Sequence, residues 1–184
     1  MPIFPKPYAD LVQKLRVPIG LVVAAGFGWF AHPTTLSLLA GLPLAASGLA
    51  LRAWAAGHLR KNQNLTTSGP YAWLRNPLYV GTLLAVGGCL IAASQAVLAV
   101  LALVAFVLIY TPVVEQEEQH LRKLFPEYAE YARRVPQFLP SPPKVGSEQR
   151  FAYAIYQRNK EHKALLGLLW AYAFLALKAF LATR

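Results

Sequence analysis

Three glutamates that follow an apolar run form the densest acidic group in the sequence. Glu115, Glu117 and Glu118 make up three of the eight acidic residues and come directly after the apolar run 97–114. Carboxylates this close raise one another's pKa unless cations or hydrogen-bond donors compensate, and such groups are typical of functional sites. Glu117 and Glu118 are therefore candidate site residues, whereas a solvated helix face is the preferred interpretation of Glu115.

A polar, turn-rich segment interrupts the apolar sequence further upstream, where residues 67–81 read TSGPYAWLRNPLYVG. Asn76 followed by Pro77 is typical of a helix start, with Asn as the N-cap and Pro in the first position. Arg75 lies between Leu74 and the next apolar run, so its guanidinium must extend towards water or meet an anion. Irregular backbone beside apolar helices is tolerated where it is buried in protein or lines a cavity, which makes this segment a second candidate site.

The histidines and the single cysteine favour no other chemistry. Cys89 stands alone in an apolar run, which indicates a packing residue and rules out a disulfide framework. Glu117 and His120 form one ExxH motif, but a di-iron bundle needs a second copy, and the sequence has none. We expect no metal, because no ligand cluster involves the four histidines His32, His58, His120 and His162. Motifs of the GxxxxGK[ST] and GxGxxG types are also absent.

These candidates lie in a chain that is too apolar for an ordinary soluble domain. Of its 184 residues 56% are hydrophobic and 14% are charged, and the mean hydropathy is +0.38. A membrane span needs about 20 helical residues, and the second, fourth and fifth apolar runs are long enough. We predict an all-α polytopic membrane protein with about five transmembrane helices, at residues 17–31, 36–57, 78–93, 97–114 and 164–182.

The connections between these runs carry further expectations. The short links at 33–34 and 94–95 predict tight antiparallel hairpins, and residues 8–15 predict an amphipathic lead-in at the membrane interface. The first run leads directly into another apolar helix and lacks a convincing cleavage site. We therefore interpret it as a helix and not as a cleaved signal.

The distribution of positive charge predicts an orientation. The chain has 18 Lys and Arg residues against 8 acidic residues, a formal net charge of +10. With a cytoplasmic N-terminus, 16 of the 18 fall on the cytoplasmic side, all except Lys178 and Arg184. The positive-inside rule therefore places the N-terminus in the cytoplasm and the C-terminus on the opposite side. Topology and attraction to anionic lipid headgroups explain the charge without a nucleic-acid partner.

Two motif blocks closely resemble the isoprenylcysteine carboxyl methyltransferase family, which is grouped with the phospholipid N-methyltransferases. TSGPYAWLRNPLYVG is followed about 35 residues later by EEQHLRKLFPEYAEYARRVPQFLP. The order and spacing match over roughly residues 58–140. The chain is accordingly interpreted as one domain over residues 1–184, with its motif core at 58–140 and an additional C-terminal membrane helix at about 164–182.

The resemblance implies membrane helices whose cytosolic ends and intervening segments form a pocket for S-adenosylmethionine, with a lipophilic acceptor entering from the bilayer. It also implies site residues by position. Arg75, Pro77, Tyr79 and Gly81 match an Arg-x-Pro-x-Tyr-x-Gly signature, Glu117 and Glu118 match an acidic pair, and Tyr128, Tyr131, Arg134, Val135 and Pro136 match a distal motif.

The sequence departs from the family pattern in two places. Asn76 stands where the family usually has histidine, so a hydrogen bond to the cofactor is retained but a titratable imidazole is not. The stretch 125–128 is one residue shorter than the usual Phe-Gly-x-x-Tyr, which leaves open whether Glu127 or Glu130 faces the site.

The implied cofactor, S-adenosylmethionine, carries a sulfonium, an ammonium and a carboxylate, and S-adenosylhomocysteine is its product. Glu117 or Glu118 is expected to neutralise the ammonium or hold the ribose hydroxyls, while Arg75 pairs with the carboxylate. The aromatic rings and polar backbone nearby are expected to line the adenine and methionyl groups. The complete cofactor-binding set is Ser68, Gly69, Tyr71, Arg75, Asn76, Pro77, Tyr79, Gly81, Glu117 and Glu118.

The acceptor is predicted to be a prenylcysteine-like carboxylate, which is ionised at neutral pH and needs an orienting cation. Arg134 is the first candidate for that cation and Arg133 the second, and Glu118 completes the candidate catalytic residues. The alternatives are a phospholipid amine, for which a glutamate can serve as the base, or a small thiol. A sterol-type reductase that uses NADPH and a non-catalytic membrane scaffold also remain open, as does the oligomeric state.

Overall fold

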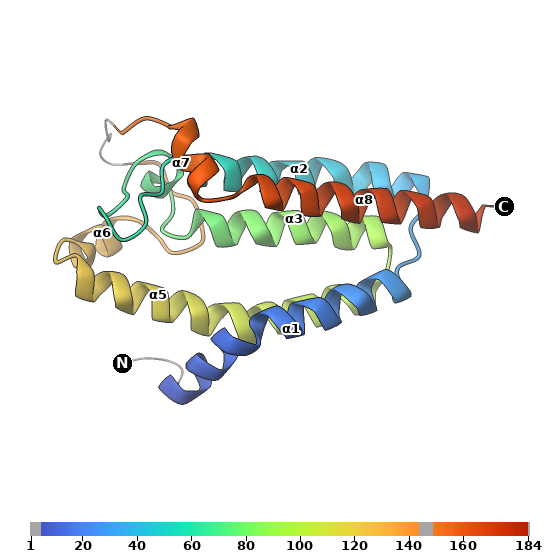
Figure 1. Cartoon of the computed structure of the whole chain (residues 1–184), viewed down its shortest axis with the longest axis horizontal. Coiled ribbons are helices and arrows are strands. Elements are labelled where there is room, and N and C mark those ends of the chain that lie inside the picture. The colour runs from blue at the N-terminus through green and yellow to red at the C-terminus, as the bar shows by residue number, and fades with distance from the viewer. Residues whose placement is uncertain (1–4, 144–148, 184) are drawn as a thin grey trace.

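The computed structural model describes residues 5–143 and 149–183, and the regular structure within these ranges is entirely helical. Figure 1 shows the order of the elements along the chain. The helices are α1 (Lys6–Phe30), α2 (Thr35–Ala56), η1 (Gly69–Ala72), α3 (Pro77–Ala93), α4 (Ala96–Ala105), η2 (Phe106–Tyr110), α5 (Thr111–Leu124), α6 (Tyr128–Arg134), α7 (Tyr153–Arg158) and α8 (His162–Ala182). Element η1 is a 3-10 helix, and η2 is a π-helical turn that joins α4 to α5.

The long helices run back and forth between two ends of the molecule (Figure 1). Helices α2, α3 and α8 lie side by side, and α1 lies with α4 and α5 on the other side. One end carries the irregular segments together with α6 and α7. The opposite end carries the short link 31–34 and the C-terminal end of α8, and a hydrogen bond of 2.8 Å from His32 N to Ala93 O ties the first link to the end of α3.

Three helices among the described residues are long and apolar enough to cross a membrane. They are α2, the continuous helix Ala96–Leu124 that contains α4, η2 and α5, and α8. Helix α3 is apolar but has only 17 residues. The expected interfacial lead-in at residues 8–15 forms part of the 25-residue α1 instead of a separate element. An all-helical fold is confirmed, and the five-span topology stays a prediction.

Among the described helices, α2 and α3 pack together most extensively, although 20 residues separate them in sequence. A Cβ atom added to Gly41 would overlap the backbone at Gly88, and one added to Gly48 would overlap the backbone of α3 near Ala85. Small residues let two helix backbones approach, which favours association where the hydrophobic effect is weak. The glycines therefore allow the close contact between α2 and α3.

Candidate functional site

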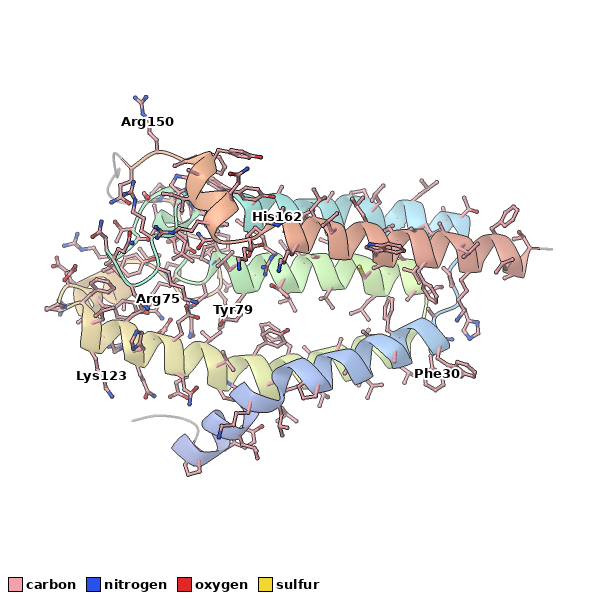
Figure 2. All side chains as sticks on the ribbon, viewed as in Figure 1. Phe30, Arg75, Tyr79, Lys123, Arg150 and His162 are labelled. Atoms are coloured by element: carbon pink, nitrogen blue, oxygen red, sulfur yellow. The ribbon has the colours of Figure 1, made fainter. Side chains whose placement is uncertain are left out.

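A cavity of about 500 Å³ lies at the end of the molecule that carries the irregular segments. Its wall comes from four parts of the chain: the loop 59–66, the segment 71–79 at the start of α3, one face of α5, and α6. A volume of this size is within the usual range for small-molecule sites. Both motif blocks of the sequence therefore border one hollow, and Figure 2 shows Arg75 and Tyr79 at this end.

Glu118 joins the two motif blocks that border the cavity. Its Oε1 lies 3.2 Å from Nε of Arg75 and accepts a hydrogen bond of 3.1 Å from Nδ2 of Asn76. Arg75 also donates from Nη1 to Ala132 O at 2.9 Å. Asn76 is the N-cap residue of α3, but its side chain makes no capping bond and binds Glu118 instead. The buried carboxylate is thus compensated by a cation and an amide, as its burial requires.

Glu117, one residue earlier, borders the cavity itself. It accepts a hydrogen bond of 2.9 Å from the hydroxyl of Tyr79, and both residues line the cavity wall. Consecutive residues of a helix point about 100° apart. Glu117 and Glu118 therefore point into different environments. Glu118 is buried against Arg75 and Asn76, whereas the carboxylate of Glu117 borders the cavity.

Tyr71 contributes a buried hydroxyl at the same place. It lines the cavity and is 7% exposed, and its hydroxyl has no hydrogen-bond partner among the described residues. Burial raises the pKa of Tyr71 well above its ordinary value, with Glu117 raising it further. A buried hydroxyl without a partner costs free energy, so Tyr71 is suited to meet a ligand group.

Backbone hydrogen bonds hold the two walls of the cavity together. Arg75 N donates to Pro136 O at 2.9 Å, and Ser141 N donates to Trp73 O at 3.0 Å. The hydroxyl of Tyr131 donates to Tyr71 O at 2.8 Å, and burial raises the pKa of Tyr131, which keeps this donor protonated. The segment after α6 therefore closes over η1 and fixes the position of Tyr71.

The structure brings most of the predicted cofactor residues to the cavity. Those on its wall are Tyr71, Arg75, Asn76, Pro77, Tyr79 and Glu117. Ser68 and Gly69 lie behind the wall, where Gly69 has a positive φ of 57° and its Cα faces the ring of His58. Gly81 lies against Gly48 and Arg52 of α2, where a Cβ atom would not fit.

The predicted catalytic arginines lie away from the cavity wall. Arg133 and Arg134 are exposed, and Arg134 forms an ion pair with Glu130 one helical turn earlier. Glu127 and Glu130 are exposed as well and do not line the cavity. None of these four side chains borders the cavity, so a role for Arg134 stays a prediction.

Two groups of cavity residues were missed by the sequence interpretation. The loop 59–66 forms one wall with little regular structure, and no local motif distinguishes it. On α5, Gln116 and His120 line the cavity beside Glu117. The helical spacing of 113, 116, 117, 120 and 121 is a signal that places these residues on one face.

Aromatic rings extend from the cavity along the transmembrane part of the fold. The ring of Tyr79 meets that of Tyr110 edge-on at 6.2 Å, and Tyr110 stacks on Phe106 at 5.6 Å. Both belong to the π-helical turn η2, whose carbonyl at Leu108 accepts a hydrogen bond of 2.8 Å from Tyr8 of α1. Such turns widen a helix locally and are frequent at functional sites.

Comparison with known proteins identifies the family of the chain. Residues 36–128 match the family described as phospholipid methyltransferase. The chain is 43% identical over 138 residues to the cobalt-zinc-cadmium resistance protein CzcN of Cupriavidus metallidurans, covering 72% of this chain and 62% of that protein. It is 35% identical over 123 residues to the nickel-cobalt-cadmium resistance protein NccN of Alcaligenes xylosoxydans xylosoxydans, covering 65% of this chain and 56% of that protein. The chain thus spans about three fifths of the length of these relatives, and no solved structure matches it significantly.

Proposed function

Because the chain belongs to the phospholipid methyltransferase family, we propose that it is an integral membrane enzyme that transfers a methyl group from S-adenosylmethionine to a lipophilic acceptor. The observation that carries the proposal is the meeting of both motif blocks at one cavity. Tyr79 with Glu117, and Arg75 with Glu118, bridge segments about 40 residues apart. The three apolar helices long enough for a membrane support its location in the bilayer.

The residues of the cavity fit the charges of the proposed cofactor. Glu117 offers a carboxylate for the ammonium group, and the buried hydroxyl of Tyr71 offers a hydrogen bond. Arg75 lines the cavity. Its Nε–H has no hydrogen-bond partner among the described residues, and Nε lies in ion-pair range of Glu118. The pocket thus presents a carboxylate, a guanidinium and a hydroxyl donor around one cavity.

When bound, S-adenosylmethionine supplies an electrophilic methyl group on a sulfonium. The protein is then required to hold the acceptor in line with that group and to exclude water, and such positioning can account for much of the rate enhancement. Val113, Leu121 and the ring of Tyr79 supply apolar surface to the cavity for this purpose.

The first candidate acceptor is a lipophilic carboxylate, such as a prenylcysteine-like group. A carboxylate needs no deprotonation at neutral pH and needs a cation to orient it. Arg134 remains the candidate for that cation, although it must first leave Glu130. Arg60 and Lys61 on the loop wall offer positive charge directly at the cavity.

A second candidate acceptor is an amine or a thiol, which must lose a proton before it attacks. The imidazole of His120 lines the cavity, one helical turn from Gln116 and Glu117, and can accept such a proton. This contact is the observation that favours the second candidate. The aromatic series from Tyr79 to Phe106 is the proposed approach from the bilayer for either acceptor.

Calorimetry on the detergent-purified protein tests the cofactor. We expect saturable binding of S-adenosylmethionine and of S-adenosylhomocysteine. Affinity for NADPH in its place would favour a sterol-type reductase, and saturation by none of the three would favour a scaffold. Either result overturns the proposal.

A methyl-transfer assay with labelled cofactor in membrane vesicles tests the acceptor. A methyl ester releases volatile labelled methanol in alkali, whereas N-methyl and S-methyl products do not. Alkali-labile label therefore identifies a carboxylate acceptor, and alkali-stable label in the lipid fraction identifies an amine or a thiol.

The names of the two relatives extend the proposal to the cell. We propose that methylation of a membrane component supports tolerance to metals such as cobalt and cadmium. Expression of the wild-type chain in a metal-sensitive strain should then raise tolerance, and the variant Glu117→Gln should not. Equal metal tolerance with the wild-type chain and with Glu117→Gln would show that methyl transfer is not needed for resistance.

We propose that the end with the cavity faces the cytoplasm, as the positive charge predicts. Cysteines introduced singly at exposed Lys123 and at exposed Thr183 should then react with an impermeant maleimide from opposite sides of the membrane. Labelling of both from the same side would contradict an odd number of spans between them.

A further inference from the structure

The segment 149–163 lies outside the region that matches the family, yet it contacts the chain where the cavity loop begins. The loop 59–66 follows directly from the C-terminal end of α2 and forms one wall of the cavity. Loop residues carry few backbone hydrogen bonds of their own, so other parts of the protein must fix their position.

Asn159 caps the end of α2. Its Nδ2 donates to Ala56 O at 2.8 Å and to Leu59 O at 3.0 Å. The last carbonyls of a helix have no partner within the helix, so an amide with two hydrogens can satisfy both groups at once. Leu59 is the first loop residue on the cavity wall, so Asn159 fixes the point where the wall leaves the helix.

Glu161 ties the same segment to both packed helices. Its two carboxylate oxygens accept hydrogen bonds from Arg52 of α2, at 2.7 Å from Nη2 and 3.0 Å from Nε. Arg52 also donates to Leu78 O of α3 at 3.3 Å. The side chains of the pair are 22% and 11% exposed, so solvent weakens the interaction only in part. A bidentate pair of this kind fixes orientation as well as distance.

A third set of contacts covers the beginning of the loop. Ala152 N donates to Gly57 O at 3.0 Å, and the ring of Phe151 meets the ring of His58 edge-on at 6.1 Å. Gly57 has no side chain, and a Cβ atom there would overlap Phe151. His58 is buried and donates from Nδ1 to Trp54 O at 2.9 Å, which holds its imidazole under Phe151.

We propose that residues 149–163 clamp the cavity loop, and that Asn159 and Glu161 are positioning residues for the cofactor. This inference rests on the proposed function for the identity of the ligand, but the clamp itself is a property of the protein alone. The clamp acts through Leu59 on the cavity wall and through Arg52 of α2. Loosening it should therefore free the loop while leaving the helices packed.

Limited proteolysis tests the clamp without any ligand. Trypsin cuts after Arg60 and Lys61, which are exposed on the loop, and after Lys123, which is exposed on α5 and serves as the internal reference. Asn159→Asp removes the hydrogen-bond donor of the side chain, and Glu161→Gln removes the negative charge. Both variants are nearly isosteric with the wild-type residue. Each should speed cleavage after Lys61 about tenfold relative to Lys123, because one lost hydrogen bond of this strength costs about that factor. Gln157→Ala, an exposed neighbour on α7, is the matched control and should cleave like wild type.

Cofactor titration supplies the second readout. Both variants should bind S-adenosylmethionine about tenfold more weakly, with turnover at saturation within about twofold of wild type, and Glu161→Asp should recover part of the affinity. Cleavage after Lys61 that equals wild type in both variants would overturn the clamp. Faster cleavage after Lys123 as well would show that a variant has unfolded globally. If Asn159→Asp and Glu161→Gln both unfold in this way, the clamp is also overturned. A wild-type protein that binds no cofactor would overturn the proposed function and leave the proteolysis result standing.

Discussion

Nε of Arg75 lies 3.2 Å from Oε1 of Glu118, and the two side chains are only 13% and 11% exposed. The two residues come from different motif blocks, so this pair joins the two segments that border the cavity. Removing one partner of such a pair leaves a buried charge without compensation, which costs more than the pair contributes.

Glu118→Gln should therefore weaken both the fold and cofactor binding. We expect a loss of up to about 3 kcal/mol in the free energy of unfolding, because Arg75 then keeps its charge without a counter-ion. Thermal unfolding in detergent and cofactor titration measure the two effects. The double variant Arg75→Met with Glu118→Gln should regain stability but not affinity, and an unaltered dissociation constant in Glu118→Gln would count against its role.

Glu117→Gln should lower cofactor affinity with little change in stability. Glu117 borders the cavity, and its loss removes the carboxylate proposed for the ammonium group. We expect the dissociation constant to rise about tenfold or more, as for the loss of a charge-assisted hydrogen bond. Glu115→Gln, on the same helix but outside the cavity wall, is the matched control. Equal effects of the two substitutions would indicate a general charge effect and not a site.

Tyr71→Phe should separate ligand binding from folding. The hydroxyl has no partner among the described residues, so its removal should not destabilise the protein at pH 7, while cofactor affinity should fall. Burial raises the pKa of Tyr71, so the folded state keeps a proton that the unfolded chain releases above about pH 10. The Tyr71 hydroxyl therefore leaves the stability unchanged below about pH 10 and lowers it as the pH rises beyond that value, because unfolding then releases a proton.

Unfolding measured between pH 8 and about pH 11 checks the alkaline behaviour. The wild type should lose stability above about pH 10, and Tyr71→Phe should lose less. Parallel losses in the two proteins would show that Tyr71 does not titrate differently in the folded state.

Arg134→Ala tests the carboxylate acceptor. If Arg134 orients the acceptor, the substitution should nearly abolish turnover and leave cofactor binding mostly intact. Glu130→Gln releases Arg134 from its ion pair and should preserve turnover or raise it. Unchanged turnover in Arg134→Ala would remove this residue from the mechanism. Arg60 and Lys61 would then be the candidates for the cation that orients the acceptor.

Gly48→Ala should destabilise the helix pair that supports the cavity. A Cβ atom at this position would overlap the backbone of α3, which cannot move aside cheaply. We expect a cost of about 1–3 kcal/mol, typical of overpacking. Gly167→Ala on α8 is the control, since nothing lies within 4 Å of its added Cβ atom. Similar unfolding temperatures for the two variants would contradict the close contact.

The helices and two of the segments that border the cavity were largely predictable from the sequence. Each long apolar run forms a helix, and Pro77 begins α3 as expected, because these signals act within a few residues. The resemblance to membrane methyltransferases, drawn from two motif blocks, is confirmed by the family match.

Other features depended on contacts that local patterns do not encode. The amide of Asn76 was expected to cap α3, but it binds Glu118, which lies 42 residues further along the chain. The loop 59–66 carries no motif, and its place on the cavity wall depends on Asn159 and the rest of the clamp.

By itself, the sequence determined the membrane character, the helices and the two motif blocks that border the cavity. Hydrophobicity, helix signals and charge are properties of neighbouring residues, so they can be inferred without knowing the fold. Only the tertiary structure decided that Glu117 borders the cavity while Glu118 is buried on Arg75, and that Arg134 faces outwards. Those outcomes depend on the rotation of each helix and on the approach of α2 to α3, which packing between distant segments sets.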